Sequence, residues 1–440
     1  MPGGVYGGDT LAVTLSAEGP VYYTLDGRVP DESCTLLTGP PELRESTVLR
    51  AVCIPEGCLP GRVLSLTYLL GEDEPMDVLA IAVDPEAFAG EEGVFTGSDK
   101  EKTCLGNLSL YEEGGGFSLD CEMGQRGNKV TGFTQKGLNF VFHGGLGGLL
   151  RYPLGEEKRL YHSLLIRSGE SRYRLNIADP VFTALARDCC TALPVQDCRY
   201  VSVYVNAEYY GLYQLRDRFS RRDLAERWDV DGDSVEIVRF NEREGTELGE
   251  LFDWAAAAPL SDPETYEQLA GQVDLEALAE WFLIQSSSGN IDTLTNIKFA
   301  RSAQYDGRWH ILLYDLDRAA EVPSGLYTVR STTAVGIPQL FNDLLRNDSF
   351  RTLLAETLSY MLHHGLTTER LLAEHEALYA QVEQQMLRSL ERWEIRPESF
   401  VSANRDFLKH IRINDPQQKL TDTASEALRL SAEEQERYFG

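Results

Sequence analysis

The spacing of the hydrophobic residues changes twice along this chain of 440 residues, and the changes limit the folds that it can adopt. Between residues 20 and 70, short stretches of alternating apolar and polar residues are separated by Gly, Pro and Asp, which predicts the strands of a small all-β sandwich. From the mid-80s to residue 338, strand-like and helix-like stretches follow one another, with a helix predicted over "LEALAEWFLIQSSS" at 275–288. After residue 338 the apolar residues recur at helical spacing, which predicts helical segments over 339–365, 368–393 and 423–439. The sequence therefore predicts an α+β protein with a β-sandwich at its start and a helical C-terminal part.

A polar segment that contains proline, "GEDEPMD" at residues 71–77, follows the first pattern. Such a segment is typical of a linker, and a chain of this length is expected to form two or three domains. We therefore predict a β-sandwich module over residues 1–72, a linker over 73–77 and a larger domain over 78–440, of which 338–440 is mostly helical.

Composition disfavours several classes of partner. Asp and Glu outnumber Lys and Arg by 69 to 41, a formal net charge of -28, which opposes binding to nucleic acid or to anionic lipid surfaces. No apolar run approaches the ~20 residues of a membrane span, and the first residues show neither the basic nor the apolar region of a signal peptide. The eight cysteines form no C-x-x-C pair, so we expect no structural zinc site.

Oxygen-bearing side chains are concentrated in two neighbouring segments. The segment "HILLYDLD" predicts an apolar strand that ends in Asp315 and Asp317, and the two-residue period of a strand points both carboxylates to one side. Asp292 and Asn296 precede it by one predicted hairpin, "IKFARSAQYDGRWHILLY", which can bring both sets of oxygens into one cleft. Hard divalent ions such as Mg²⁺ prefer these ligands, so a metal and phosphoryl site is predicted; the alternative is that these residues cap turns at the hairpin ends.

The layout is similar to that of protein kinases. In those enzymes one Asp accepts the proton of the substrate hydroxyl, an Asn a few residues later binds a metal ion, and a second Asp after a hairpin does so too. Here the step from Asp292 to Asn296 is four residues rather than five, no His-Arg-Asp is present, and Asp-Leu-Asp stands in place of Asp-Phe-Gly. The chain is therefore no ordinary protein kinase.

Six elements in a fixed order resemble the CotH kinases, the spore coat protein H-like atypical protein kinases. They are "RGN" at 126–128 with Lys136, "IRSGES" at 166–171, "VNAEYYGLYQLRDR" at 205–218, "NIDTLTN" at 290–296, "WHILLYDLD" at 309–317, and "ERW" at 391–393. The resemblance extends from about residue 78 to the end of the chain. It implies a compact kinase-like fold, transfer of the ATP γ-phosphate to Ser or Thr of a coat or cell-surface protein, dependence on Mg²⁺ with Mn²⁺ as the alternative ion, and a place in the spore coat or at the cell surface.

The resemblance also implies roles for individual residues. Asp292 matches the catalytic acid, Asn296 and Asp315 match the metal ligands, and Asp317 is the second acid of the same motif.

Three further residues are implied to contact ATP or its phosphates: Lys136, Arg126 and Asp217. Without the resemblance, the sequence predicts Lys136 only as an exposed lysine of a strand. Arg126 either contacts the same phosphates or anchors its turn. The family has Glu at the position of Asp217, and the residues after "RGN" are Lys129 and Val130 rather than the usual Ser and Trp. These departures keep a pseudokinase open as an alternative.

The first 65 or so residues resemble the chitobiase C-terminal-like module. The resemblance depends on Tyr23, Thr24, Asp26, Gly27 and Pro30 in one turn and on "LRA" at 49–51 in a later strand. It implies a module that binds carbohydrate or another surface, or a spacer that carries the next domain. A glycosyltransferase that uses "DLD" at 315–317 to hold a metal diphosphate, and a non-catalytic surface protein, are the remaining alternatives.

Overall fold

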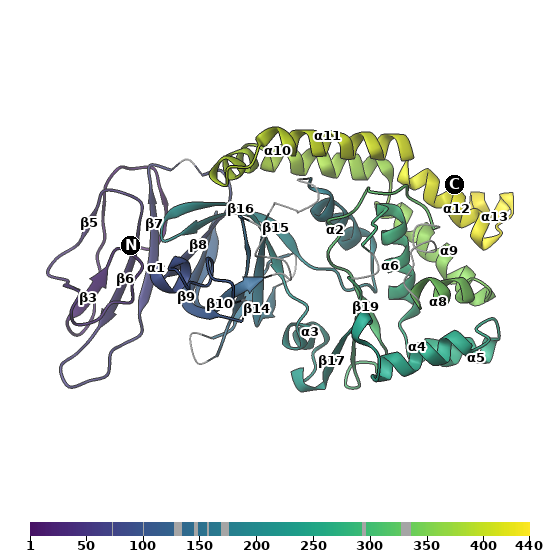
Figure 1. The fold of residues 1–440 in the computed structure, drawn as a ribbon, viewed down its shortest axis with the longest axis horizontal. Coiled ribbons are helices and arrows are strands. Elements are labelled where there is room, and N and C mark those ends of the chain that lie inside the picture. Colours follow the sequence, from purple (N-terminus) through teal and green to yellow (C-terminus); the bar gives the residue numbers. More distant parts are fainter. Residues whose placement is uncertain are drawn as a thin grey trace. The chain divides into compact units, whose positions relative to one another are not determined.

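The computed structural model describes residues 1–72, 74–99, 101–126, 134–144, 148–155, 158–168, 176–292, 296–326 and 336–440. The chain forms two compact units (Figure 1). Unit 1 comprises Met1–Glu170, Arg199–Arg218 and Gln384–Arg396, and unit 2 comprises Ser171–Cys198, Phe219–Glu383 and Pro397–Gly440. Strands dominate the first unit and helices the second, which confirms the α+β prediction. No helix in the described ranges has both the length and the apolar character that crossing a membrane requires.

The N-terminal part of unit 1 is the predicted β-sandwich. A five-stranded sheet in the order β1-β7-β6-β3-β4 is accompanied by the two-stranded sheet β2-β5. Their bounds are β1 Gly4–Tyr6, β2 Leu11–Ala12, β3 Val21–Thr24, β4 Thr35–Leu36, β5 Glu42–Leu43, β6 Thr47–Cys53 and β7 Leu64–Leu70. Leu49 and Tyr68 pack with Val13 and Leu43 in one apolar core, as the two-residue alternation of β6 and β7 predicts.

The rest of unit 1 is built around a closed seven-stranded barrel in the order β10-β11-β14-β16-β15-β8-β9. Its strands are β8 Val78–Val83, β9 Thr103–Glu112, β10 Gly115–Arg126, β11 Gly137–Val141, β14 Ser163–Ser168, β15 Cys198–Val205 and β16 Glu208–Asp217. The short helix α1 (Pro85–Ala89) and the ribbon β12 (Leu150–Tyr152) with β13 (Arg159–Tyr161) accompany it. Alternate residues of the strands fill the barrel with one apolar core.

The β-sandwich and the barrel share an apolar contact. Leu69 of β7 is fully buried and packs with four buried residues of the barrel strands and their connection: Val78, Ala80, Tyr204 and Ala207. The backbone N–H of Thr67 donates to the hydroxyl of Tyr111 at 3.2 Å, and Arg62 pairs with Asp120 at 2.9 Å. The sandwich is therefore packed against the barrel within unit 1.

The predicted linker carries a buried carboxylate; Asp73, its first residue, lies outside the described residues. The side chain of Glu74 has no exposed surface. It accepts hydrogen bonds from the hydroxyls of Ser202 and Tyr204, both at 2.9 Å, and from Arg388 at 3.0 Å. These hydrogen bonds tie the segment to β15 and to the end of α10 (Thr368–Arg392), so it is a structural part of unit 1.

Unit 2 consists of helices and a small antiparallel sheet in the order β17-β18-β19. Its helices are α2 Ala178–Cys189, α3 Arg221–Trp228, α4 Glu247–Ala257, α5 Pro263–Ala270, α6 Leu275–Ser288, α8 Ile337–Leu344, α9 Asp348–His363, α10 Thr368–Arg392, α11 Pro397–Asn414, α12 Pro416–Leu428 and α13 Ala432–Phe439, and its strands are β17 Val235–Arg239, β18 Lys298–Ser302 and β19 His310–Leu312. The end of α10, from Gln384, is counted with unit 1.

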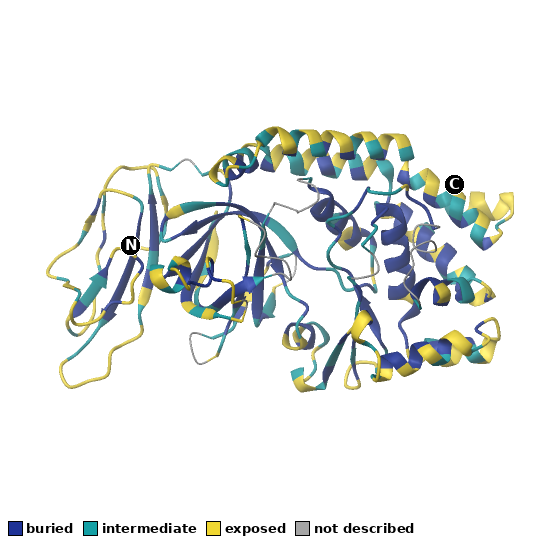
Figure 2. Ribbon diagram, viewed as in Figure 1, coloured by how far each residue is buried: buried dark blue, intermediate teal, exposed yellow. Residues whose placement is uncertain are grey.

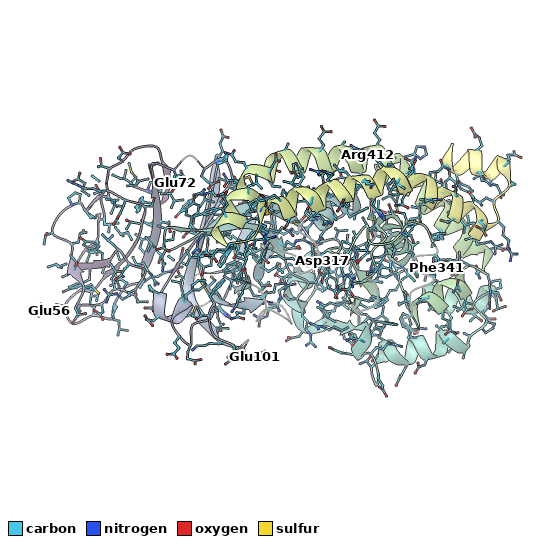
Figure 3. The ribbon with its side chains drawn as sticks, turned by 45° about the horizontal axis from the view of Figure 1, so that its top comes forward. Glu56, Glu72, Glu101, Asp317, Phe341 and Arg412 are labelled. Atoms are coloured by element: carbon cyan, nitrogen blue, oxygen red, sulfur yellow. The ribbon has the colours of Figure 1, made fainter. Side chains whose placement is uncertain are left out.

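Helix α6 is the buried centre of unit 2. Figure 2 shows it in the colour of buried residues along almost its whole length. It contacts α2, α9, α12 and β19. Its Phe282 ring lies 3.8 Å, centroid to centroid, from that of Phe341 in α8, which Figure 3 labels. The bounds of α6 agree with the sequence prediction over "LEALAEWFLIQSSS".

The structure corrects the helical prediction in three places. The segment 339–365 is divided between α8 and α9 because the buried side chain of Asn347 accepts from the N–H groups of Ser349 and Phe350 and starts a new helix. The closing segment 423–439 is divided between α12 and α13 by a capping box at Ser431. Helix α11 was not predicted separately.

A buried histidine joins the start of α6 to the β18–β19 turn. His310 is 3% exposed, its Nδ1 lies 3.0 Å from Asp274, the N-cap of α6, and its Nε2 lies 3.0 Å from Asp306. Burial by itself lowers the pKa of His310, but the hydrogen bonds and charges of the two carboxylates outweigh it and raise the pKa. Arg308, 3.7 Å from Asp274, is the other charged group in this cluster.

We predict that His310→Gln destabilises the protein more at low pH than at high pH. A raised folded pKa means that the charged histidine stabilises the fold fully below its unfolded pKa of about 6.5, and that this contribution is lost as pH rises through the folded pKa. Urea unfolding at about pH 6 and about pH 9 should show a smaller mutational loss at the higher pH, because the contribution of the charged histidine declines as pH rises. His363→Gln, an exposed change on α9, serves as the control, and an equal loss for His310→Gln at both pH values would contradict the charged bridge.

Candidate functional site

The C-terminal end of α6 is closed by a segment that lies more than thirty residues later in the chain. The last carbonyls of a helix have no partner within the helix and need donors from elsewhere. Here the donors come from residues 320–325: Ala320 N–H to Ser288 at 2.7 Å, Val322 N–H to Gly289 at 3.3 Å, Gly325 N–H to Ser286 at 2.8 Å and the Ser324 hydroxyl to Ser287 at 2.7 Å. The chain that leads into Asp292 is thereby joined to the chain that follows Asp317.

Gly289 makes this junction possible. It ends α6 in the left-handed conformation, with φ 57°, which favours glycine. A Cβ at this position would lie 2.1 Å from the carbonyl oxygen of Val322, closer than atoms can approach. The close passage of the two segments therefore requires a residue with no side chain.

The first pair of predicted residues is held together after this turn. Asn290 is 1% exposed; its Nδ2 donates to Gln285 at 3.1 Å, and its Oδ1 accepts from the backbone N–H of Asp292 at 3.1 Å. The amide nitrogen of Asn296 donates to Asp292 Oδ2 at 3.0 Å. Because that nitrogen is used, the Asn296 oxygen is the atom that can act as a metal ligand. The intervening residues 293–295 lie outside the described residues.

The hairpin prediction is confirmed, and it brings the second segment to the same place. Strands β18 and β19 are antiparallel, with Lys298 opposite Leu312. Asn296 lies two residues before Lys298, and Asp315 lies three residues after Leu312. Both therefore lie just beyond the same end of the hairpin. The two segments that carry the predicted oxygen ligands therefore meet the small sheet at the same end.

The prediction that the strand extends to the two acids of "YDLD" is wrong. Strand β19 ends at Leu312, and Asp315 adopts a left-handed conformation with φ 65°. The two-residue alternation of a strand therefore does not apply to Asp315 and Asp317, although Leu316 between them is fully buried. A non-glycine residue in this conformation carries local strain, and such residues are common at functional sites.

The donor set fits a hard cation. Asp292, Asp315 and Asp317 provide carboxylates and Asn296 an amide oxygen, and Mg²⁺ is typically held by one or two carboxylates, with substrate phosphates and water completing its coordination. In the described ranges, no three His, Cys, Asp or Glu side chains gather closely enough to hold a metal, so Asp292, Asp315 and Asp317 do not form a three-carboxylate site by themselves. Half-buried Asp317, which Figure 3 labels, precedes Arg318, whose guanidinium forms two hydrogen bonds with Glu321 at 3.0 and 2.8 Å.

Two predicted phosphate contacts lie together in unit 1. Arg126 ends β10 opposite Gly137, and Lys136 comes directly before β11, so both lie at one end of the β10–β11 hairpin. Arg126 donates to Asn139 at 3.4 Å. Lys136 donates to the Phe95 carbonyl at 2.5 Å, and burial lowers its pKa. Lys136 is therefore half-buried, which corrects the expectation of an exposed strand lysine; residues 127–128 of "RGN" lie outside the described residues.

The third predicted contact in unit 1, Asp217, ends β16 opposite Leu164 and is 1% exposed. By strand alternation it shares a face with Leu215 and Tyr213, which belong to the barrel core. Asp217, Arg126 and Lys136 thus belong to unit 1. The four residues that we call the oxygen cluster belong to unit 2: Asp292, Asn296, Asp315 and Asp317.

Sequence reasoning missed the residues that support the site. Gly289 follows a helical pattern and is a recognisable helix end, so its role could have been found. Asn290 lies in the quoted motif "NIDTLTN", but its bond to the Asp292 backbone depends on local geometry that no sequence pattern specifies. Ser324 and its neighbours gave no signal, because their partners are carbonyls far away in the sequence.

Comparison with known proteins agrees with the resemblance. Residues 174–414, more than half of the chain, match the family described as CotH kinase protein, and residues 1–65 match the chitobiase/beta-hexosaminidase C-terminal domain. The chain belongs to the CotH kinase protein family. Among curated proteins, none matches the chain.

We predict that Gly289→Ala strongly destabilises unit 2, with Gly307→Ala as the matched control. Both glycines have positive φ, 57° and 74°, but an added Cβ meets the Val322 carbonyl only at Gly289 and open space at Gly307. We expect a loss in the free energy of unfolding of about 1 kcal/mol for Gly307→Ala, from backbone strain alone, and ~3 kcal/mol or more for Gly289→Ala. Urea denaturation measures both; equal losses would show that the close passage at Val322 is not required.

Proposed function

We propose that this protein is an atypical protein kinase that transfers the γ-phosphate of ATP to Ser or Thr of a protein substrate. Membership of the CotH kinase protein family supports a kinase-like function. The observation that carries the proposal further is the oxygen cluster of unit 2, in which Asp292 and Asn296 are hydrogen-bonded and Asp315 follows from the same hairpin end.

In this proposal Asp292 accepts the proton of the attacking hydroxyl, since a positioned carboxylate can act as a general base. The side-chain amide of Asn296 orients Oδ2 of Asp292, and Asn290 accepts from the backbone N–H of Asp292. Asn296 and Asp315 hold Mg²⁺, or Mn²⁺ in its place, with Asp317 as a further acid. The bound ion would offset the charge of the phosphate oxygens.

The cationic contacts to ATP are assigned to Lys136 and Arg126, with Asp217 as their acidic partner. The two cations lie at one hairpin end, and the lowered pKa of Lys136 reflects a partly desolvated amine. An ATP phosphate would compete with the Phe95 carbonyl for this amine. We extend the proposal to a coat or cell-surface protein as substrate and to a carbohydrate ligand for the N-terminal module, bound away from the surface around Leu69 and Thr67 that packs on the barrel.

A non-catalytic member of the family is the second candidate. The observation that favours it is Asp217, which is one methylene shorter than the family's Glu and is buried at the end of β16. A shorter carboxylate at a buried position has less reach toward a lysine or a metal ion. In that case the chain would bind nucleotide without transferring phosphate.

We expect the parent chain to transfer label from γ-labelled ATP to itself or to dephosphorylated casein when Mg²⁺ or Mn²⁺ is present. Asp292→Asn should lower the rate by about 100-fold or more, because the amide retains the shape but loses the proton acceptor. Thermal unfolding should show that the variant remains folded. Transfer from a UDP-sugar instead of ATP would support a glycosyltransferase, and unchanged turnover in Asp292→Asn would remove that residue from catalysis.

The two acids of "YDLD" should not be equivalent. Asp315 sits at the left-handed turn directly after the hairpin, so Asp315→Asn is predicted to abolish the Mg²⁺-dependent part of ATP binding, while Asp317→Asn retains some of it. Calorimetric titration of ATP with and without Mg²⁺ measures this difference, and Asp233→Asn, an exposed change in the turn before β17, is the control. Binding of Mg-ATP by Asp315→Asn as tightly as by the parent would place the metal elsewhere.

A further inference from the structure

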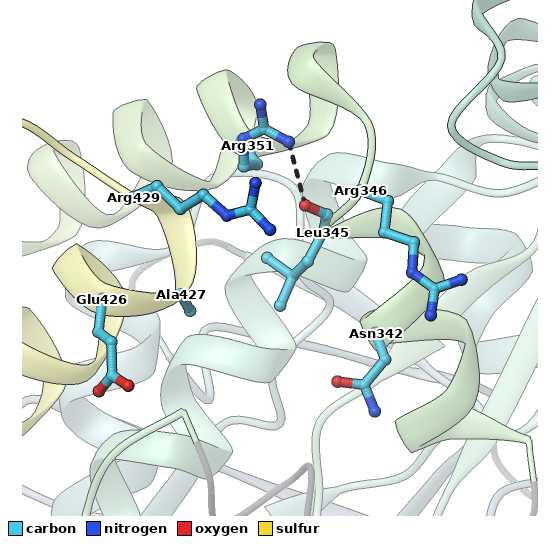
Figure 4. Close-up of a pocket in the computed structure, with 7 residues that line it drawn as sticks. All are labelled: Asn342, Leu345, Arg346, Arg351, Glu426, Ala427 and Arg429. Atoms are coloured by element: carbon cyan, nitrogen blue, oxygen red, sulfur yellow. Dashed lines mark hydrogen bonds between the residues drawn. The ribbon is translucent and has the colours of Figure 1, made fainter.

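A separate polar pocket lies in unit 2 where the end of α8, the start of α9 and the end of α12 meet (Figure 4). Its volume is about 610 Å³, within the range of small-molecule sites. The residues that line it are Asn342, Leu345, Arg346, Arg351, Glu426, Ala427 and Arg429. None of them belongs to the candidate site around Asp292.

Three of the lining residues are arginines, and each comes from a different segment. Arg346 follows α8, Arg351 lies in the first turns of α9, and Arg429 follows α12. Arg429 has φ 58°, and its backbone N–H donates to the carbonyls of Glu426 and Ser425. The C-cap of α12 therefore fixes the backbone of Arg429. Three guanidinium groups around one hollow stand out in a chain with a net charge of -28.

The neighbouring carboxylates do not satisfy these cations well. Asp343 pairs with Arg346 at 3.1 Å, and the arginine side chain is 73% exposed. Asp348 pairs with Arg351; the Asp348 side chain is 88% exposed, whereas that of Arg351 is 25% exposed. An ion pair with one solvent-exposed member contributes little, so both arginines can exchange it for a stronger acceptor. Across the described ranges, Arg429 forms no ion pair, and Figure 4 shows the carboxylate of Glu426 turned away from its guanidinium.

Stabilisation of helix ends explains only part of the cluster. A cation near a helix C-terminus is favourable, which accounts for Arg346 and Arg429. Arg351 lies in the first turns of α9, where the helix dipole disfavours a positive charge. It donates to the carbonyl of Leu345 at 3.2 Å, and Figure 4 shows this bond at the edge of the hollow, with the Arg429 side chain extending toward it.

We propose that this pocket binds the phosphate group of a phosphate monoester. The planar guanidinium fork matches phosphate oxygens, and charge-assisted hydrogen bonds of this kind are among the strongest in proteins. The volume admits more than a bare phosphate ion. The site is independent of the proposed kinase activity, since it shares no residue with the oxygen cluster.

The test is calorimetric titration of the full chain with a phosphoserine peptide, with the same peptide unphosphorylated, and with inorganic phosphate. We expect the phosphopeptide to bind and its unphosphorylated form not to bind, with affinity falling as salt rises. Arg429→Gln should weaken binding by about tenfold or more, and Arg351→Gln likewise. Arg370→Gln is the matched control, since Arg370 is a surface arginine of α10 paired with Asp188 and Glu374.

Arg429→Gln is the more informative variant because the Arg429 side chain forms no ion pair within the part of the chain that the structure describes, so the fold should be retained. Equal binding of inorganic phosphate and phosphopeptide would identify the phosphate group alone as the ligand and would still support the site. Binding that survives in the Arg351→Gln/Arg429→Gln double variant would place the phosphate elsewhere in the molecule and overturn the proposal. Absence of binding by every phosphate probe would overturn it as well.

Discussion

The closed C-terminal end of α6 is the interaction on which the candidate site depends. The buried helix would leave its last carbonyls without partners, and residues 320–325 supply the donors. One of these segments leads into Asp292 and the other follows Asp317, so the closed helix end joins the two parts of the chain that carry the proposed catalytic and metal-binding residues. The proposed site is thus coupled to the packing of a core helix in unit 2.

The support continues through buried polar groups rather than apolar ones. Gln285, Ser286, Ser287, Ser288 and Asn290 are all buried at the end of α6, where a purely structural helix would be expected to carry apolar side chains. Buried polar groups are costly unless they are hydrogen-bonded, and here Asn290 donates to Gln285 and accepts from the backbone N–H of Asp292. In the proposed kinase, this network would hold the backbone of Asp292 in place, and catalysis of phosphoryl transfer is mostly positioning and electrostatics.

Local patterns were sufficient to predict much of the fold. The bounds of α6, the β18–β19 hairpin, the strands of the N-terminal module and the family follow from spacing and ordered motifs. What failed depends on contacts between distant residues. The left-handed Asp315 precedes a segment that is bonded to the end of α6, and the burial of Glu74 depends on Ser202, Tyr204 and Arg388. No window of sequence contains both partners of such contacts. The division of α8 from α9 is an exception, because Asn347 caps α9 through Ser349 and Phe350 directly after it.

The central claim is that Asp292, Asn296 and Asp315 together surround the metal of a bound nucleotide. Paramagnetic broadening by Mn²⁺-ATP, followed in amide spectra of the labelled chain, tests it most directly. The account predicts that the signals of Asp292, Asn296 and Leu316 broaden first, while that of Val48 in the N-terminal module stays sharp. Early broadening at other positions, with these three signals unchanged, would contradict it.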